Sequence, residues 1–282
     1  MTSVTSALNA ARLISAIDSL ALEEGMELTI GTDFETYAEL RRHQDGRGLV
    51  SSMFDPAVAD VDDMNGFWVL GRNAEGAIVH TQAVRNFDMD DEAAARRFYG
   101  NLDSYFARVH DAEALGARCA FPMMRQRIHG GKVCYHGEIW LSREYRGRGL
   151  SALLPRLLMA LAFVRWAPVY MFGLVPAKLA SCGIACQYGY YHVEPEGFVL
   201  ESGGPATANR WLVWMADDDL HRLLRQDPEA ESSSGGIAKR KPMPALQASP
   251  STAAAIGDRT PTSVLHVVPE WQPEPGHNAA VR

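Results

Sequence analysis

The chain has 282 residues, of which 47% are hydrophobic and 22% are charged, and its net charge is -7 at neutral pH. This composition is typical of a globular protein with a sizeable core, and the acidic balance excludes a broad basic surface for nucleic acid. No stretch reaches the ~20 apolar residues of a membrane helix, and the N-terminus lacks the pattern of a signal peptide. We therefore expect a cytoplasmic protein that binds neither nucleic acid nor membranes.

The hydrophobic pattern predicts a helical N-terminal segment over 1–25, a domain over 26–226 and a tail over 227–282. The strands are expected, in chain order, at 26–32, 67–70, 77–84, 117–124, 133–142, 169–175, 191–200 and 210–216. The helices are expected at 5–24, directly after Asp33, at 91–109, at 150–166, at 176–188 and at 217–226. Eight of the fifteen prolines lie in the tail, which we expect to be disordered.

The cysteines indicate free thiols rather than a metal site. Cys119, Cys134, Cys182 and Cys186 show no paired CxxC spacing, and no pair of histidines lies near the last two to complete a zinc site. We therefore expect reduced thiols and no bound metal.

The glycine-rich segment 146–149 (RGRG) is the most informative feature, because it lies between a buried strand and a strongly apolar helix. Glycine lets the backbone approach an anion closely, and the start of a helix carries a partial positive charge. Arg146 and Arg148 add charge for phosphate oxygens. The segment thus predicts a pyrophosphate-binding turn, and an exposed arginine–glycine turn without a ligand is the alternative.

Two other phosphate-binding motifs do not fit this turn. The pattern GxxxxGK[ST] is absent from the chain, which excludes an ordinary P-loop. The dinucleotide pattern GxGxxG also fails, because Gly147 and Gly149 are followed by Ala152 where the third glycine belongs.

The stretch 141–158 (LSREYRGRGLSALLPRLL) resembles the central motif of the GNAT superfamily, the GCN5-related N-acetyltransferases. The family pattern [QR]-x-x-G-x-[GA] is matched by Arg146 and Gly149, whereas Ser151 stands where the family has Gly or Ala. A strand, a helix and the pair Gly189-Tyr190 follow, as in the family's next motif. The resemblance implies an α/β fold with a mixed, mostly antiparallel central sheet flanked by helices and splayed between its fourth and fifth strands.

The resemblance also implies that acyl-coenzyme A, most simply acetyl-CoA, is the acyl donor. Backbone groups near Leu141 and Ser142 would pair with the pantetheine arm, and the amides of 147–151 would hold the pyrophosphate. The implied coenzyme A site therefore consists of Leu141, Ser142, Arg146, Gly147, Arg148, Gly149, Leu150 and Ser151.

The implied reaction is direct attack by an amine on the thioester carbonyl, which requires a group or a water chain that removes the amine proton. His136 and Glu138 are two residues apart, so alternation predicts that they share one face of their strand. Glu138 is the first candidate base and His136 the second. The alternative is that one of them pairs with an arginine and the other faces solvent. The family often places a tyrosine, the general acid, where this chain has Ala185.

The sequence says least about the acyl acceptor of the implied reaction. We expect a small-molecule or protein amine, and the helical insertion over 88–132 lies where it would shape the acceptor pocket, although packing also explains its aromatic residues. There are two alternatives for the function. One is a non-catalytic module that binds coenzyme A or a protein partner, and the other is a transferase for longer acyl chains. The sequence leaves a homodimer open.

Overall fold

A computed structural model describes 4–44, 50–51, 53–90, 92–93, 95–96, 98–100, 102, 118–120, 122–128, 130–201 and 207–226. The expected tail, 227–282, lies outside the described residues. So does the middle of the expected insertion, 103–117, which includes the end of the helix expected over 91–109.

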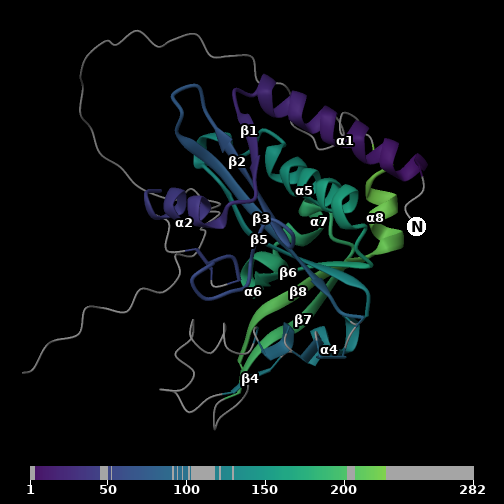
Figure 1. Cartoon of the computed structure of the whole chain (residues 1–282). Coiled ribbons are helices and arrows are strands. Elements are labelled where there is room, and N and C mark those ends of the chain that lie inside the picture. The colour runs from purple at the N-terminus through teal and green to yellow at the C-terminus, as the bar shows by residue number, and fades with distance from the viewer. Residues whose placement is uncertain are drawn as a thin grey trace, which may run out of the picture. The chain divides into compact units, whose positions relative to one another are not determined.

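The strands form one mixed sheet in the order β1-β2-β3-β5-β6-β8-β7-β4 (Figure 1). Their bounds are β1 Glu27–Gly31, β2 Gly66–Arg72, β3 Ile78–Asp88, β4 Arg118–Ala120, β5 Lys132–Leu141, β6 Tyr170–Pro176, β7 His192–Glu201 and β8 Thr207–Ala216. Every neighbouring pair is antiparallel except β5 and β6, which are parallel. The predicted fold class, an α/β protein with a mixed and mostly antiparallel sheet, is confirmed.

The helices follow the predicted order except for α4, which was not expected and begins within the strand predicted over 117–124, where β4 covers only Arg118–Ala120. Their bounds are α1 Val4–Glu23, α2 Phe34–Arg42, α4 Pro122–Arg127, α5 Leu150–Trp166, α6 Ala177–Ser181, α7 Ile184–Tyr188 and α8 Asp217–Leu223. The single helix expected over 176–188 is two short helices, because Gly183 adopts a left-handed conformation with φ 80° between α6 and α7. Asp33 caps α2 as predicted, since its Oδ1 accepts hydrogen bonds from the amides of Glu35 and Thr36. None of the described helices combines the length and apolarity that a bilayer crossing requires.

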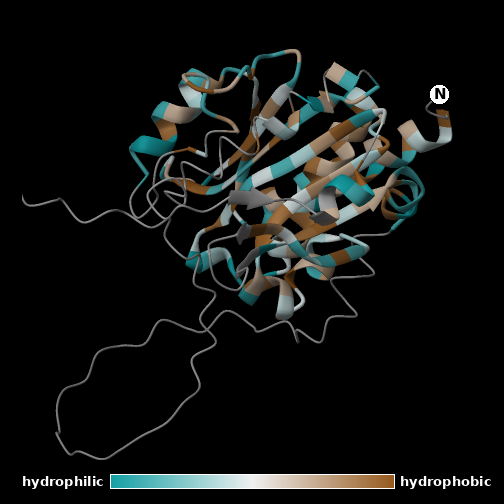
Figure 2. Cartoon of the chain, turned by 90° about the horizontal axis from the view of Figure 1, so that it is seen from below, coloured by the Kyte–Doolittle hydropathy of each residue, from teal (hydrophilic) through white to brown (hydrophobic). Residues whose placement is uncertain are grey.

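Helices cover both faces of the sheet. Eleven of the 17 residues of α5 are buried, because the sheet covers one side of this helix and α1 packs along another (Figure 1). Leu13 and Ile17 of α1 belong to the same core cluster as Leu157 and Leu158 of α5. Burial of each such side chain contributes roughly 1.5–3 kcal/mol. Figure 2 shows that hydrophobic residues run along the central strands.

The opposite face of the sheet carries a second core cluster. It includes Tyr37 of α2, Phe54 of the segment before β2, and Phe172 of β6, all of which are fully buried. The Phe54 ring stacks on Tyr135 of β5 at 5.6 Å between ring centroids. The segment before β2 is therefore part of the core on this face.

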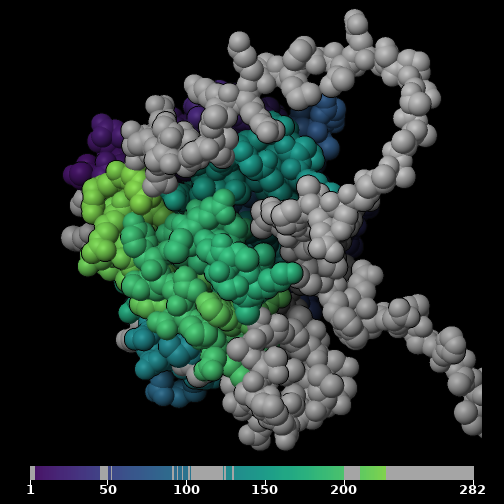
Figure 3. Space-filling view, turned by 180° about the vertical axis from the view of Figure 1, so that it is seen from behind, coloured from purple at the N-terminus to yellow at the C-terminus, as the bar shows by residue number. Residues whose placement is uncertain are grey.

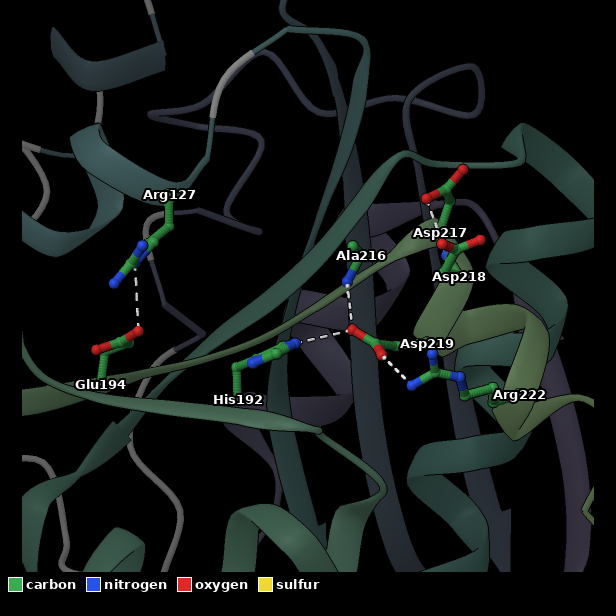
Figure 4. Close-up of polar contacts among 8 residues, drawn as sticks. All are labelled: Arg127, His192, Glu194, Ala216, Asp217, Asp218, Asp219 and Arg222. Carbon is green, nitrogen blue, oxygen red and sulfur yellow. Dashed lines mark hydrogen bonds and ion pairs between the residues drawn. The ribbon is translucent and has the colours of Figure 1, made fainter.

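Helix α8 links the last strands to α1. His221 Nδ1 lies 3.0 Å from Ser6 Oγ of α1, and Figures 1 and 3 both show α8 beside the N-terminal end of α1. Asp219 Oδ2 accepts from the amide of Ala216 and lies 2.9 Å from His192 Nε2 of β7 (Figure 4). These contacts hold β7 and β8 to the helix that follows them.

A bulge in β5 changes which side chains share a face. The register with β3 shifts between Thr81 and Ala83, and Glu138 has a φ of 58°. A Cβ added to Gly137 would meet Phe54, and the Glu138 side chain bonds to Arg41 of α2 on that same face. The prediction that His136 and Glu138 share one face is wrong, because the bulge places two successive residues on the α2 side.

Strands β5 and β6 diverge soon after they begin. They pair only from Val133↔Tyr170 to Tyr135↔Phe172, although β5 continues to Leu141 and β6 to Pro176. In the family resemblance, the strand before the glycine-rich turn, here β5, corresponds to the family's fourth strand, and the next strand along the chain, here β6, corresponds to its fifth. The implied splay of the sheet is therefore confirmed.

Candidate functional site

The glycine-rich turn lies between the end of β5 and the start of α5. Gly147 and Gly149 have φ values of 76° and 85°, and Gly149 directly precedes the helix. Both conformations are left-handed and favour glycine. A Cβ at either position would meet no atom within 4 Å, so the turn presents its backbone to open space.

The backbone amides of this turn are available to a ligand. Within the described part of the chain, the N–H groups of Gly147, Arg148 and Gly149 donate to no protein group. They lie at the N-terminus of a 17-residue helix, where the helix dipole adds a partial positive charge. Leu150, the first helical residue, is 1% exposed and anchors the turn in the core. The arrangement suits an anion such as a pyrophosphate.

The two arginines of the turn are held by nearby groups. Arg146 Nε donates to the carbonyl of Leu141 at 2.9 Å, which fixes the turn against the end of β5. Arg148 lies 3.3 Å from the carboxylate of Glu24 and above the ring of Tyr145. Because both partners of the Arg148 pair are more than 40% exposed, water screens it and leaves the arginine able to turn toward a phosphate.

Two serines border the turn. Ser142 is buried, its amide donates to the carbonyl of Val79, and its hydroxyl has no hydrogen-bond partner among the described residues. A buried hydroxyl without a partner is uncommon, and a polar group of a ligand would satisfy it. The Ser151 hydroxyl accepts from Gln187 Nε2 of α7 at 3.0 Å, so it links α5 to α7.

His136 lies on the α5 side of β5 and is 2% exposed. Its Nδ1 is 3.1 Å from the Tyr190 hydroxyl and its Nε2 is 3.2 Å from Gln82 Oε1. Burial, and secondarily the neighbouring His80, lowers the pKa of His136 to about 3. At neutral pH the imidazole is therefore uncharged and a poor proton acceptor.

His136 is expected to make the folded state less stable as the pH falls from 7 to 5. The unfolded chain takes up a proton near the ordinary pKa of 6.5, whereas the folded chain stays neutral down to a pKa of about 3. Since the unfolded state binds more protons in this window, the free energy of unfolding falls by about 2 kcal/mol. Urea unfolding at pH 7 and pH 5 measures this change. Between these pH values the free energy of unfolding should fall by about 2 kcal/mol less in His136→Gln than in the wild-type protein. Equal decreases in the two proteins would contradict a lowered pKa of His136.

Glu138 lies on the opposite face of β5 in a buried ion pair. Its Oε2 is 2.8 Å from a terminal nitrogen of Arg41, and the two side chains are 7% and 4% exposed. Its Oε1 accepts from the amide of Ser51 at 3.0 Å. Glu138 thus follows the alternative expectation, in which one of the two residues pairs with an arginine, while His136 is buried instead of facing solvent.

The general-acid position holds no acidic group. Ala185 is fully buried in the core beside α5. Tyr188 lies near Arg146, and burial raises the pKa of its hydroxyl to about 12. Tyr190 is 3% exposed, and burial raises its pKa well above the ordinary value. Both tyrosines border the site, but neither takes the position of Ala185.

No sequence motif indicates a role for Gln82, although its Oε1 lies 3.2 Å from His136 Nε2 in the structure. The signal that points to it is the polar run His80-Thr81-Gln82 between the apolar pairs 78–79 and 83–84, because polar side chains in a buried strand require partners. The sequence resemblance points to Tyr190 only as the aromatic residue that follows Gly189. Among the described residues, no group of three or more His, Cys, Asp or Glu side chains is placed to hold a metal ion.

Comparisons with known proteins find similarity to solved structures alone. No protein-family model matches the chain, and no curated protein matches it. It is similar to NAA60 of Arabidopsis thaliana in complex with acetyl-CoA, at 9% identity over 68% of this chain and 98% of that one, with a TM-score of 0.39.

Two further structures show similarity of the same order. FeeM, an N-acyl amino acid synthase from uncultured soil microbes, is 11% identical over 78% of this chain and 90% of that one, with a TM-score of 0.34. A GCN5-related N-acetyltransferase from Brucella melitensis is 14% identical over 63% of this chain and 62% of that one, also with a TM-score of 0.34. Similarities of this size assign neither a substrate nor a reaction to this chain.

Proposed function

We propose that this protein is a GNAT-type acyltransferase that transfers an acyl group, most simply acetyl from acetyl-CoA, to a primary amine. The observation that carries the proposal is the turn before α5. Its amides at Gly147, Arg148 and Gly149 have no protein acceptor in the described chain and lie at the start of a buried helix. The motif resemblance of 141–158 and the divergence of β5 from β6 support it.

The proposed donor site follows from these contacts. The amides of 147–151 would hold the pyrophosphate, with Arg146 and Arg148 adding charge. The edge of β5 near Leu141 and Ser142 would pair with the amides of the pantetheine arm, and the unpartnered Ser142 hydroxyl supplies a further polar group there. The thioester would then lie where β5 and β6 separate.

The proposed reaction forms a C–N bond and breaks the C–S bond of the thioester. The nitrogen lone pair attacks the carbonyl carbon, the amine gives up one proton, and the coenzyme A thiolate leaves. A thiolate has a low enough pKa to leave with modest help, so the reaction does not require an acid at Ala185. For proton removal we propose Glu138 ahead of His136, because an imidazole with a pKa of about 3 is a weak base at neutral pH.

Acetyl-CoA and a panel of primary amines test the proposal through the release of free thiol. We expect thiol release that depends on the amine, and Glu138→Gln should lower kcat about 100-fold if this carboxylate accepts the proton. Binding of coenzyme A without thiol release for any amine would instead indicate the non-catalytic module, which Ala185 favours. Acyl-CoA donors of increasing chain length would show whether a longer acyl group is preferred.

A further inference from the structure

Three buried side chains form a continuous hydrogen-bonded chain beside the divergence of β5 and β6. Gln82 Nε2 donates to the carbonyl of Leu154 in α5 at 2.8 Å, and Gln82 Oε1 lies 3.2 Å from His136 Nε2. His136 Nδ1 lies 3.1 Å from the Tyr190 hydroxyl. Gln82, His136 and Tyr190 are 0%, 2% and 3% exposed, so water does not compete for these contacts.

The carbonyl of Leu154 determines which group donates and which accepts in each of these hydrogen bonds. A carbonyl only accepts, so the Gln82 amide must turn its NH₂ group toward α5 and its oxygen toward His136. That oxygen also accepts, so the proton of the neutral imidazole lies on Nε2 and the lone pair on Nδ1. The Tyr190 O–H therefore donates to Nδ1. Burial keeps His136 uncharged at neutral pH, so Nδ1 carries no proton and accepts the hydrogen bond from Tyr190.

The Tyr190 oxygen lies where the strands separate. Gly173 is the first residue of β6 beyond the last pair with β5. A Cβ added to Gly173 would lie 3.1 Å from the His136 carbonyl oxygen and 3.4 Å from the Tyr190 oxygen. Within the described part of the chain, no group donates to the Tyr190 oxygen. Its O–H thus donates to His136, while its lone pairs have no donor among the residues that the structure describes.

We propose that the Tyr190 oxygen is a fixed hydrogen-bond acceptor for a substrate N–H group, either a pantetheine amide of coenzyme A or the acceptor amine. This inference rests on the proposed function, which places the thioester at the divergence of β5 and β6. On the acceptor amine, such a bond would hold the nitrogen with its lone pair toward the carbonyl carbon. Since the Tyr190 O–H donates to His136 Nδ1, Tyr190 does not replace the acid missing at Ala185. His136 and Gln82 act through Tyr190 and are positioning residues.

Tyr190→Phe tests the acceptor, with Tyr99→Phe as the matched control. Tyr99 is also a buried tyrosine, and its hydroxyl donates to the carbonyl of Ile128 within the second core cluster. We expect Tyr190→Phe to lower either the affinity for coenzyme A or the kcat/KM for the amine about tenfold, which is the effect of one hydrogen bond. A loss of coenzyme A affinity in calorimetry identifies a pantetheine amide. A loss in kcat/KM for the amine, at unchanged coenzyme A affinity, identifies the acceptor amine.

The inference would be overturned if Tyr190→Phe, with a Tm equal to that of the Tyr99→Phe control, kept the coenzyme A affinity and the kcat/KM of the wild-type protein. A second measurement needs no ligand. Nitrogen-15 NMR should find His136 neutral, with its proton on Nε2, from pH 5 to pH 8, and a proton on Nδ1 would overturn it as well. If the wild-type protein binds no coenzyme A, the proposed function fails by itself, and the tautomer of His136 then decides whether Tyr190 presents an acceptor.

Discussion

Gly149→Glu is expected to weaken the binding of coenzyme A about 100-fold, which corresponds to about 3 kcal/mol. The new carboxylate would stand at the turn whose amides are expected to hold the pyrophosphate, so it would repel the ligand and cover its donors. Any side chain also strains a backbone with a φ of 85°. Isothermal titration with coenzyme A measures the effect.

Gly76→Glu is the matched control for this variant. Gly76 lies in the turn between β2 and β3, has a φ of 78°, and leaves open space for a Cβ just as Gly149 does. The two variants therefore share a left-handed backbone position and the added charge, but only Gly149 lies at the start of α5. An equal affinity for coenzyme A in both variants would contradict the role of the turn.

Arg41→Met is expected to lower the free energy of unfolding by about 3–5 kcal/mol. The variant removes the cation that lies 2.8 Å from the buried Glu138 carboxylate, whose Oε1 accepts from the amide of Ser51. Removal of one partner of a buried pair costs more than the pair itself contributes, because the remaining charge stays desolvated. Urea unfolding at neutral pH measures the loss.

An exposed ion pair supplies the control for Arg41→Met. Arg96 and Glu92 lie 2.7 Å apart, but their side chains are 69% and 84% exposed, so Arg96→Met should change stability by less than about 1 kcal/mol. The double variant Arg41→Met with Glu138→Gln should recover part of the loss, because it removes the buried charge as well. Equal losses in Arg41→Met and Arg96→Met would show that the Glu138 carboxylate is not a buried charge.

The geometry of the glycine-rich turn could be predicted from local sequence. The turn at 146–149 combines glycines, arginines and a following apolar run, and each of these acts within a few residues of its neighbours. The structure places Gly149 directly before α5, and the amides of Gly147, Arg148 and Gly149 have no acceptor among the residues that the structure describes. Local patterns carry this information because the strand, the turn and the helix are consecutive.

The surroundings of the polar residues of β5 depend on contacts that no local pattern contains. Simple alternation placed His136 and Glu138 on one face, but a single bulge separates them. Their partners come from distant segments: Arg41 lies 97 residues before Glu138, and Tyr190 lies 54 residues after His136. Sequence reasoning found the polar residues of β5, and only the folded sheet shows which groups they meet.

The most direct test of the central claim follows the backbone amides of the turn by NMR during titration with coenzyme A. We expect the amide signals of Gly147, Arg148 and Gly149 to shift most, and the same titration with pantetheine, which lacks the pyrophosphate, to leave them nearly unchanged. Coenzyme A that binds while these three signals stay in place, or no binding at millimolar concentration, would contradict the assignment of this turn to the pyrophosphate.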